Sequence, residues 1–163
     1  MKTSNVQKVT KFHLEGLKEV LDSSALFPSE YLDDMISDYF TNPDSEDIWF
    51  TYMLNDRPIA LGYCVPEKFT NGTFNLYAIA VHGAYQGKGI GKEMMLYIEK
   101  LLTQAGKRVL LVETSSQPRY DNTRAFYHKI GYTAQAVLPH FWDEGDDKVI
   151  FYKKLLSTRQ KLY

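Results

Sequence analysis

Residues 85–92 read Tyr-Gln-Gly-Lys-Gly-Ile-Gly-Lys, with three glycines at alternate positions. Glycine lets the backbone approach a ligand closely, and the free N–H groups at the start of a helix favour an anion. Apolar residues at helical spacing follow directly, from Ile90 to Ala105, and Lys88 and Lys92 add local positive charge. The pattern predicts a phosphate-binding loop. The alternative is that the glycines only end a strand and let the next helix pack closely.

The two common nucleotide loops do not fit this spacing. A Walker A loop requires a lysine followed by Ser or Thr, and no Lys-Ser or Lys-Thr pair follows these glycines. The dinucleotide fingerprint G-x-G-x-x-G, started at Gly87 and Gly89, needs a third glycine where Lys92 stands.

Two motifs resemble those of the GNAT superfamily of acyl-CoA-dependent N-acyltransferases. Gln86-x-x-Gly89-x-Gly91 is similar to its [QR]-x-x-G-x-[GA] signature at a strand-to-helix junction. Residues 122–127, Asn-Thr-Arg-Ala-Phe-Tyr, followed by Gly131-Tyr132, resemble its second signature, although the tyrosine follows the alanine by two positions and not three. The resemblance covers the whole chain, and the first 60 residues match in pattern more than in residues.

The resemblance implies an acyltransferase of class EC 2.3.1 that uses acetyl-CoA as acyl donor and no metal. An amine of a small molecule or peptide would attack the acetyl group directly in a ternary complex. The pantetheine arm would pair like an extra strand with the strand before the loop, where a splay from the strand at 109–112 would open a slot. The implied donor-binding residues are Ile79, Ala80, Val81, Gln86, Gly87, Lys88, Gly89, Ile90, Gly91, Lys92, Asn122 and Tyr127.

Tyr127 matches the family tyrosine that acts as general acid toward the CoA sulfur. A phenol of ordinary pKa about 10 can protonate a thiolate whose thiol has a pKa near 8.5 only slightly uphill. The alternative is a core tyrosine beside Phe126. Asn122 is the expected partner on the donor side, with helix capping as its alternative.

The general base has three candidates, two glutamates and a water chain. Glu113 follows the apolar run 109–112, where burial could raise its pKa toward that of a useful base. Its alternative is to fix Ser115, Ser116 or Arg124. Glu67, before the Asn71-Gly72 turn, is the second candidate, and a water chain held by Tyr77 is the third.

The acceptor side is marked only by aromatic and acidic residues. Phe141 and Trp142, beside acidic residues at 143–147, could border the acceptor mouth and favour a cationic amine, or form a solvated hairpin tip. Tyr31 and Tyr77 are further acceptor-side candidates. Trp49 could contribute with Tyr31 from the side of the first two helices, and core packing is the alternative for both residues.

Other chemistries lack their residues. The four histidines are scattered without a metal-binding motif, and no nucleophile elbow is present. The single cysteine, Cys64, lies in an apolar run and is interpreted as a small buried residue.

The elements needed to position these residues follow from periodicity and turn signals. Expected helices lie near 14–24, 29–41, 90–105 and 121–130, and expected strands near 6–9, 48–54, 58–69, 73–81, 109–112, 132–137 and 149–155. The order βααβββαβαββ predicts an α/β fold, with a mixed twisted sheet of about seven strands flanked by about four helices.

Length, composition and net charge limit the number of domains and the kinds of partner. The 163 residues carry a net charge of −1 with 44% hydrophobic residues, which predicts a single domain over 1–163 and gives no field for nucleic acid. No signal peptide or membrane span is evident, so a cytoplasmic protein is expected. Dimers are common in the family, so the resemblance is compatible with a homodimer. A GNAT-like sensor that binds acyl-CoA without turnover is the competing function.

Overall fold

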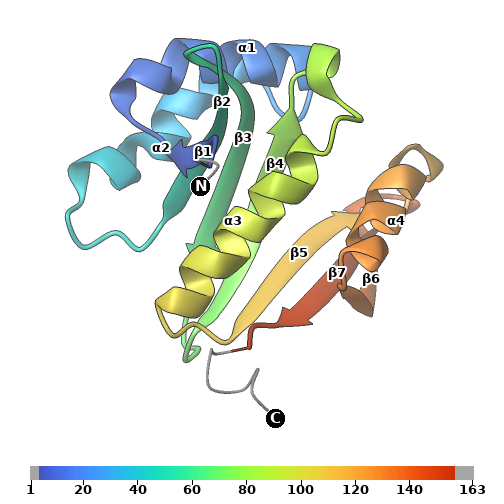
Figure 1. Ribbon diagram of the computed structural model, residues 1–163. Coiled ribbons are helices and arrows are strands. Elements are labelled where there is room, and N and C mark those ends of the chain that lie inside the picture. Colours follow the sequence, from blue (N-terminus) through green and yellow to red (C-terminus); the bar gives the residue numbers. More distant parts are fainter. Residues whose placement is uncertain (1–3, 157–163) are drawn as a thin grey trace. The chain divides into compact units, whose positions relative to one another are not determined.

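The computed structural model describes residues 4–156, whose strands form a seven-stranded sheet in the order β1-β2-β3-β4-β5-β7-β6. The strands are Val6–Lys8 (β1), Ile48–Leu54 (β2), Arg57–Pro66 (β3), Thr73–Val81 (β4), Val109–Ser115 (β5), Thr133–Asp143 (β6) and Asp146–Lys154 (β7). The α-helices are Leu14–Ser24 (α1), Leu32–Thr41 (α2), Ile90–Gln104 (α3) and Asp121–Lys129 (α4), with short 3-10 turns at Lys11–His13, Ser29–Tyr31, Gly83–Tyr85 and Pro118–Tyr120. The predicted element order and mixed α/β fold are confirmed (Figure 1).

The chain divides into two compact units, each made of two separate stretches. Unit 1 comprises 1–65 and 77–98, and unit 2 comprises 66–76 and 99–163. Both β4 and α3 run from one unit into the other. The expectation of a single domain over 1–163 stays a prediction.

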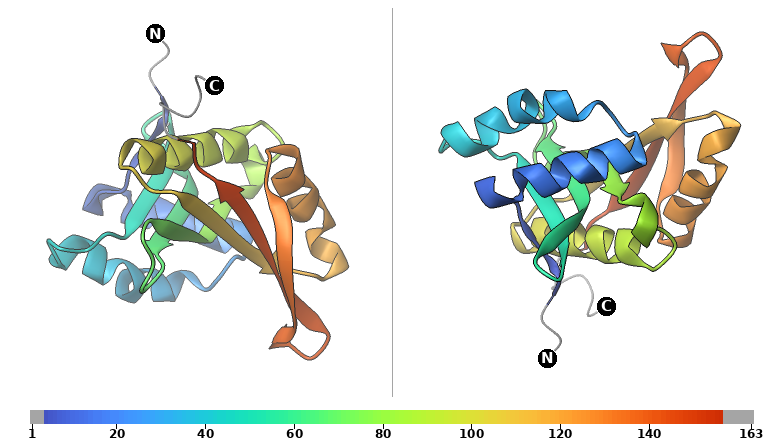
Figure 2. Two further views of the ribbon diagram at one scale, coloured as in Figure 1. Left: turned by 90° about the horizontal axis from the view of Figure 1, so that it is seen from below. Right: turned by 90° about the horizontal axis from the view of Figure 1, so that it is seen from above.

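Unit 1 is built on the antiparallel ladders of β1 with β2 and β2 with β3. Asn55 and Asp56 have positive φ of 47° and 61°, the conformation that a tight hairpin turn requires. Helices α1 and α2 cover one face of the strands, where Leu17, Leu32 and Trp49 are fully or almost fully buried. Figures 1 and 2 show both helices beside β2 and β3.

The opposite face of these strands is covered by α3. Side chains alternate along a strand, so Phe50 points away from its neighbour Trp49, and its ring lies 5.7 Å from that of Tyr97 on α3. A Cβ at Gly62 would lie only 2.2 Å from the Phe50 ring. Only glycine leaves room for Phe50 at this position.

Unit 2 holds a parallel ladder of β4 with β5, followed by antiparallel ladders of β5 with β7 and β7 with β6. Helix α4 lies along the hairpin of β6 and β7 (Figure 2). Its aromatic residue Tyr127 packs against Phe151, with ring centroids 5.4 Å apart. All eleven residues of β6 are exposed.

Several predicted boundaries need correction. Strand β3 ends at Pro66 and not near Phe69, because Phe69 takes a left-handed φ of 62° in the loop before Gly72. Strand β5 extends beyond Val112 to Ser115, since its ladder with β7 continues to that residue. Strands β6 and β7 are also longer than expected.

Candidate functional site

The glycine loop of unit 1 is held at its start by local hydrogen bonds. Gln86 Nε2 donates to the carbonyl oxygen of Val81 over 3.1 Å, so the signature glutamine closes the turn after β4. Gly83 N donates to Ser23 Oγ of α1 over 2.8 Å. These bonds fix the chain where it leaves β4, and Ile90 anchors the other end of the loop because its side chain is buried.

Gly87 and Gly89 adopt left-handed φ angles of 74° and 81°, which disfavour any residue with a Cβ. A Cβ built on either glycine would meet no atom within 4 Å. For these two glycines, the close-packing alternative is therefore wrong, since their Cβ positions are open. The loop leaves its backbone accessible, and the first N–H groups of α3 have no acceptor within the helix.

The lysines of the loop lie on its exposed side. Lys88 Nζ is 5.5 Å from the centre of the Tyr85 ring, which is a cation–π distance. Lys88 and Lys92 are exposed, as are Gln86, Gly87 and Gly89. Of the predicted pantetheine contacts, Ala80 is buried in the unit 1 core, and Ile79 and Val81 are half-buried.

Tyr127, on α4 in unit 2, lies in a cluster of aromatic rings. Its side chain is 2% exposed, and the rings of Phe126, Tyr132 and Phe151 lie 5.4, 5.8 and 5.4 Å from its own. Burial raises the pKa of Tyr127 above the ordinary value of a phenol. The phenol therefore stays protonated at neutral pH and is a weaker acid than a solvated tyrosine.

Helix capping, the alternative role for Asn122, is wrong. The residue at the N-cap position is Tyr120, and its side chain makes no capping hydrogen bond. Asp121 is the first helical residue and is paired with Arg124, so it does not cap. Asn122 is the second helical residue and is exposed.

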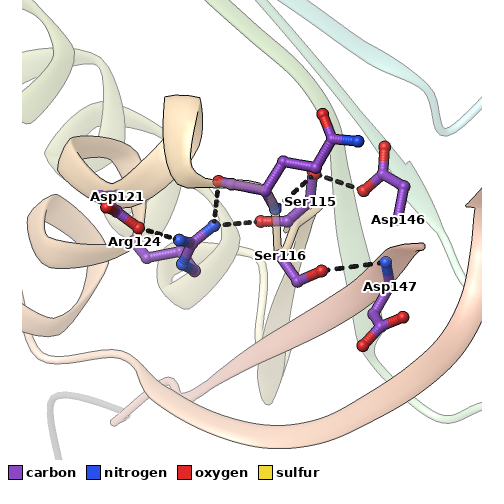
Figure 3. Close-up of polar contacts among 7 residues, drawn as sticks. Ser115, Ser116, Asp121, Arg124, Asp146 and Asp147 are labelled. Carbon is purple, nitrogen blue, oxygen red and sulfur yellow. Dashed lines mark hydrogen bonds and ion pairs between the residues drawn. The ribbon is translucent and has the colours of Figure 1, made fainter.

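A polar network ties the end of β5 to α4 and to the start of β7 (Figure 3). Arg124 donates to the carbonyl oxygens of Ser115 and Gln117, while Ser115 Oγ donates to Asp146. The guanidinium binds these carbonyls and Asp121, not Glu113 as one sequence alternative supposed. The signature segment 122–127 is thus tied through Arg124 to the chain that follows β5.

Ser116 adds a second link in the same network. Its Oγ accepts from Asp147 N, and its own N donates to the Asp147 carbonyl oxygen, each over 3.0 Å. Asp147 Oδ1 in turn accepts from His140 N over 2.9 Å. The start of β7 is therefore fastened directly to the chain at the end of β5.

The two candidate bases, Glu67 and Glu113, are brought together in unit 2 by Asn75. Asn75 Nδ2 donates to Glu67 Oε1 and to Glu113 Oε1, both over 2.8 Å. Lys148 Nζ is 2.9 Å from Glu113 Oε2, and the two side chains of this pair are 12% and 15% exposed. These four residues are called the carboxylate cluster below. Sequence reasoning found the glutamates but missed Asn75 and Lys148.

Phe141 and Trp142 cover the lysine of the cluster. Lys148 Nζ lies 4.1 Å from the Phe141 ring centre and 5.8 Å from that of Trp142. Trp142 Nε1 donates to the carbonyl oxygen of Thr114 over 3.3 Å, which attaches this part of β6 to β5. Both aromatic side chains remain half exposed, so the picture of a wholly solvated hairpin tip is incomplete.

The remaining aromatic candidates lie in unit 1. Tyr77 is half exposed, and its ring is 6.0 Å from that of Tyr63. Tyr63 stacks on Trp49 at 3.9 Å and donates to Asp47. Tyr31 is also half exposed, whereas Trp49 is fully buried in the core. The core interpretation is therefore right for Trp49 and wrong for Tyr31.

Two other features of the described residues bear on chemistry. Cys64 is fully buried, and burial raises the pKa of its thiol, which disfavours the reactive thiolate. Among residues 4–156, no three His, Cys, Asp or Glu side chains are grouped so that they could hold a metal ion. In the same part of the chain, no helix is long and apolar enough to cross a membrane.

Solved structures of other proteins share this fold. A protein from Desulfovibrio desulfuricans, described as a GNAT-family acetyltransferase, is 25% identical, with a TM-score of 0.86 over 93% of this chain and 98% of that one. The ribosomal-protein-S18-alanine N-acetyltransferase from Escherichia coli is 16% identical, with a TM-score of 0.75 over 97% of each chain. An aminoglycoside 6'-N-acetyltransferase solved with coenzyme A is 17% identical, with a TM-score of 0.74 over 93% of this chain and 97% of that one.

The sequence itself defines the class more closely. Residues 15–132 match the model of the Acetyltransferase (GNAT) family. No curated protein sequence matches the chain. The fold and this match show that the chain belongs to the GNAT acetyltransferase family, whose members use acetyl-CoA.

Proposed function

We propose that the protein transfers the acetyl group of acetyl-CoA to a primary amine of a small molecule or peptide, by direct attack in a ternary complex. The observation that carries the proposal is the loop at Gly87 and Gly89, with its left-handed, open glycines directly before α3. This loop lies within the region that matches the family. A neighbour of the same fold was solved with coenzyme A.

The donor would be held mainly by backbone groups. Residues 86–92 offer N–H groups at a helix start, and Lys88 and Lys92 add charge for a pyrophosphate. The strand segment Ile79–Val81 would pair with the pantetheine arm, as an added strand does. Asn122 would contact the donor from α4.

The reaction needs one group to take a proton and another to supply one. In our proposal Glu113 or Glu67 takes the proton of the attacking amine, and Tyr127 gives its phenolic proton to the departing sulfur. Because burial raises the pKa of Tyr127, the proton transfer to sulfur is more uphill than it would be for a solvated phenol.

The acceptor is proposed to be a cationic amine. Phe141 and Trp142 already contact an ammonium group, that of Lys148, at cation–π distances. Tyr31 and Tyr77 present half-exposed rings of the same chemistry in unit 1. These residues would select for positive charge rather than for a particular molecule.

A sensor that binds acyl-CoA without turnover is the second candidate function. The observation that favours it is the burial of Tyr127 among aromatic rings, which suits a core residue as well as an acid. The intact loop would then serve binding alone.

Calorimetry with acetyl-CoA, together with a free-thiol assay over polyamines, amino acids, aminoglycosides and peptide N-termini, separates the two functions. The transferase binds acetyl-CoA and releases CoA only when a suitable amine is present. Binding without amine-dependent thiol release would support the sensor and contradict the transferase.

A further inference from the structure

The ladder registers of unit 2 place three residues of the carboxylate cluster on one face of the sheet. Asn75 pairs with Leu111, two residues before Glu113, and Lys148 pairs with Ser115, two residues after it. Side chains two positions apart on a strand point to the same face, and diagonal neighbours on adjacent strands lie within reach of long side chains. The contacts in the cluster are therefore a direct result of strand register.

The fourth member, Glu67, is delivered by the loop before β4. Glu67 N donates to the carbonyl oxygen of Thr73 over 2.8 Å, and Thr70 Oγ1 donates to the Glu67 carbonyl oxygen over 2.8 Å. These bonds hold the backbone of Glu67 beside the start of β4. Its carboxylate can then reach the amide of Asn75.

The orientation of the Asn75 amide is fixed by chemistry. Ionised carboxylates only accept hydrogen bonds, so the NH2 group must face both glutamates. The Asn75 side chain is 1% exposed, and its Oδ1 has no partner among residues 4–156. Asparagine therefore carries a cost at this strand position, because an apolar side chain would have no buried acceptor to leave unpaired. The two hydrogen bonds to carboxylates are what explains an asparagine here.

The carboxylates of Glu67 and Glu113 differ in how many of their oxygen atoms have a partner. Both oxygens of Glu113 are engaged, Oε1 by Asn75 and Oε2 by the ammonium of Lys148. Glu67 Oε1 is bound by Asn75, while Glu67 Oε2 has no hydrogen-bond or ion-pair partner in the part of the chain that the structure describes. Glu67 is also half-buried and not sealed in the core.

We propose that Asn75 is a positioning residue that holds Glu67 as the proton acceptor, while Lys148 keeps Glu113 as a fixed negative charge. This inference rests on the proposed acetyl transfer and assigns its open base. A proton passes from the acceptor's ammonium group to Glu67 Oε2. The electron pair left on nitrogen forms the bond to the thioester carbon, and the C–S bonding pair leaves with sulfur, which takes the proton of Tyr127. Water then takes the second proton from the new amide nitrogen and the proton held by Glu67, and it returns one proton to Tyr127.

A double-mutant cycle on turnover tests the assignment with the best amine from the panel. We expect Glu67→Gln to lower kcat about 100-fold and Asn75→Ala about 30-fold, with the KM for acetyl-CoA changed less than about twofold. Because Asn75 acts through Glu67, the double variant should lose about 100-fold and not the product of the two losses. Glu113→Gln should lose only about tenfold.

Matched controls separate positioning from general damage. Glu99 forms an ion pair with Lys153 in the same unit, and its side chain is 13% exposed, close to the 15% of Glu113. Glu99→Gln should keep kcat near that of the wild type. In amide NMR spectra of the wild type, one asparagine side chain should show two protons protected from exchange, and Asn75→Ala should remove that pair of signals.

The possible failures are distinguishable. If Glu67→Gln keeps kcat within about threefold of the wild type, or if the losses of Glu67→Gln and Asn75→Ala multiply, the assignment is overturned while the proposed transfer stands. If the wild type releases no CoA with any amine, the proposed function fails and Glu67 has no such role. If every asparagine side chain exchanges as fast as an exposed one, the Asn75 bridge is absent and the positioning role is overturned.

Discussion

In the glycine loop, the groups proposed to bind the donor are backbone N–H groups of consecutive residues, and Gly87 and Gly89 have open Cβ positions and left-handed backbones. In the carboxylate cluster, every functional group is a side chain, and the four residues come from a loop and three strands. A loop of the first kind tolerates changes of side chain but not of backbone conformation. A cluster of the second kind depends on register and on each side chain.

Among side chains of unit 2, the largest effect is expected for Tyr127→Phe. This change removes one oxygen atom and keeps the ring that packs on Phe151. If the phenol supplies a proton, kcat falls about 100-fold while the KM for acetyl-CoA stays within about twofold. Steady-state kinetics at saturating amine measures both values. An unchanged kcat would show that Tyr127 is a core residue and would contradict its role as general acid.

The corresponding test on the glycine loop is Gly89→Val. A β-branched residue is strained at the φ of 81°, so we expect acetyl-CoA to bind about 30-fold more weakly, equivalent to about 2 kcal/mol. Calorimetry gives the affinity. Gly106→Val is the matched control, since Gly106 has a φ of 75° and an equally open Cβ position after α3. If both variants weaken binding equally, local ligand contact at Gly89 is not the cause.

Removing the cation from the cluster should affect stability as well as turnover. Lys148→Met leaves Glu113 without its ionic partner in a place where both side chains are mostly buried. We expect the free energy of unfolding to fall by about 2 kcal/mol, measured by urea denaturation. The double variant with Glu113→Gln should recover part of that loss, and Lys153→Met should lower stability without lowering kcat. A double variant less stable than Lys148→Met would contradict the pairing.

The smallest effect is expected at the edge of the cluster. Phe141→Leu keeps apolar bulk but removes the aromatic face over Lys148. The free energy of unfolding should fall by about 0.5 kcal/mol, and the KM for a cationic amine should rise about threefold while that for acetyl-CoA does not change. A neutral acceptor gives the control, because its KM should be insensitive. An equal rise for both acceptors would argue against selection by charge.

Most of the fold could be predicted because its signals are local. The helical spacing from Leu14 to Leu21 and the β-rich run before Val81 each define an element within a short window. The glycine loop could be predicted equally well from the sequence, since its motif consists of consecutive residues. The sequence pattern predicts ends for β5 and β6 that fall too early, because the ladders with β7 extend both strands and no local signal marks that pairing.

The candidate site was only half predictable for the same reason. Glu67 and Glu113 were found as acidic residues at element ends, but Asn75 looked like any polar residue inside a strand. Its importance depends on which residues of β4 and β5 stand opposite each other. Lys148 was likewise hidden, because its pairing with Glu113 depends on the register of β5 with β7.

The shared elements β4 and α3 have a consequence for dividing this chain. Unit 2 begins with 66–76, is interrupted by 77–98, and resumes at 99. A cut between Val65 and Pro66 would therefore separate the two stretches that make up unit 1, and no contiguous fragment contains one complete unit without part of the other. We therefore expect a divided gene to give folded protein only where both fragments are expressed together.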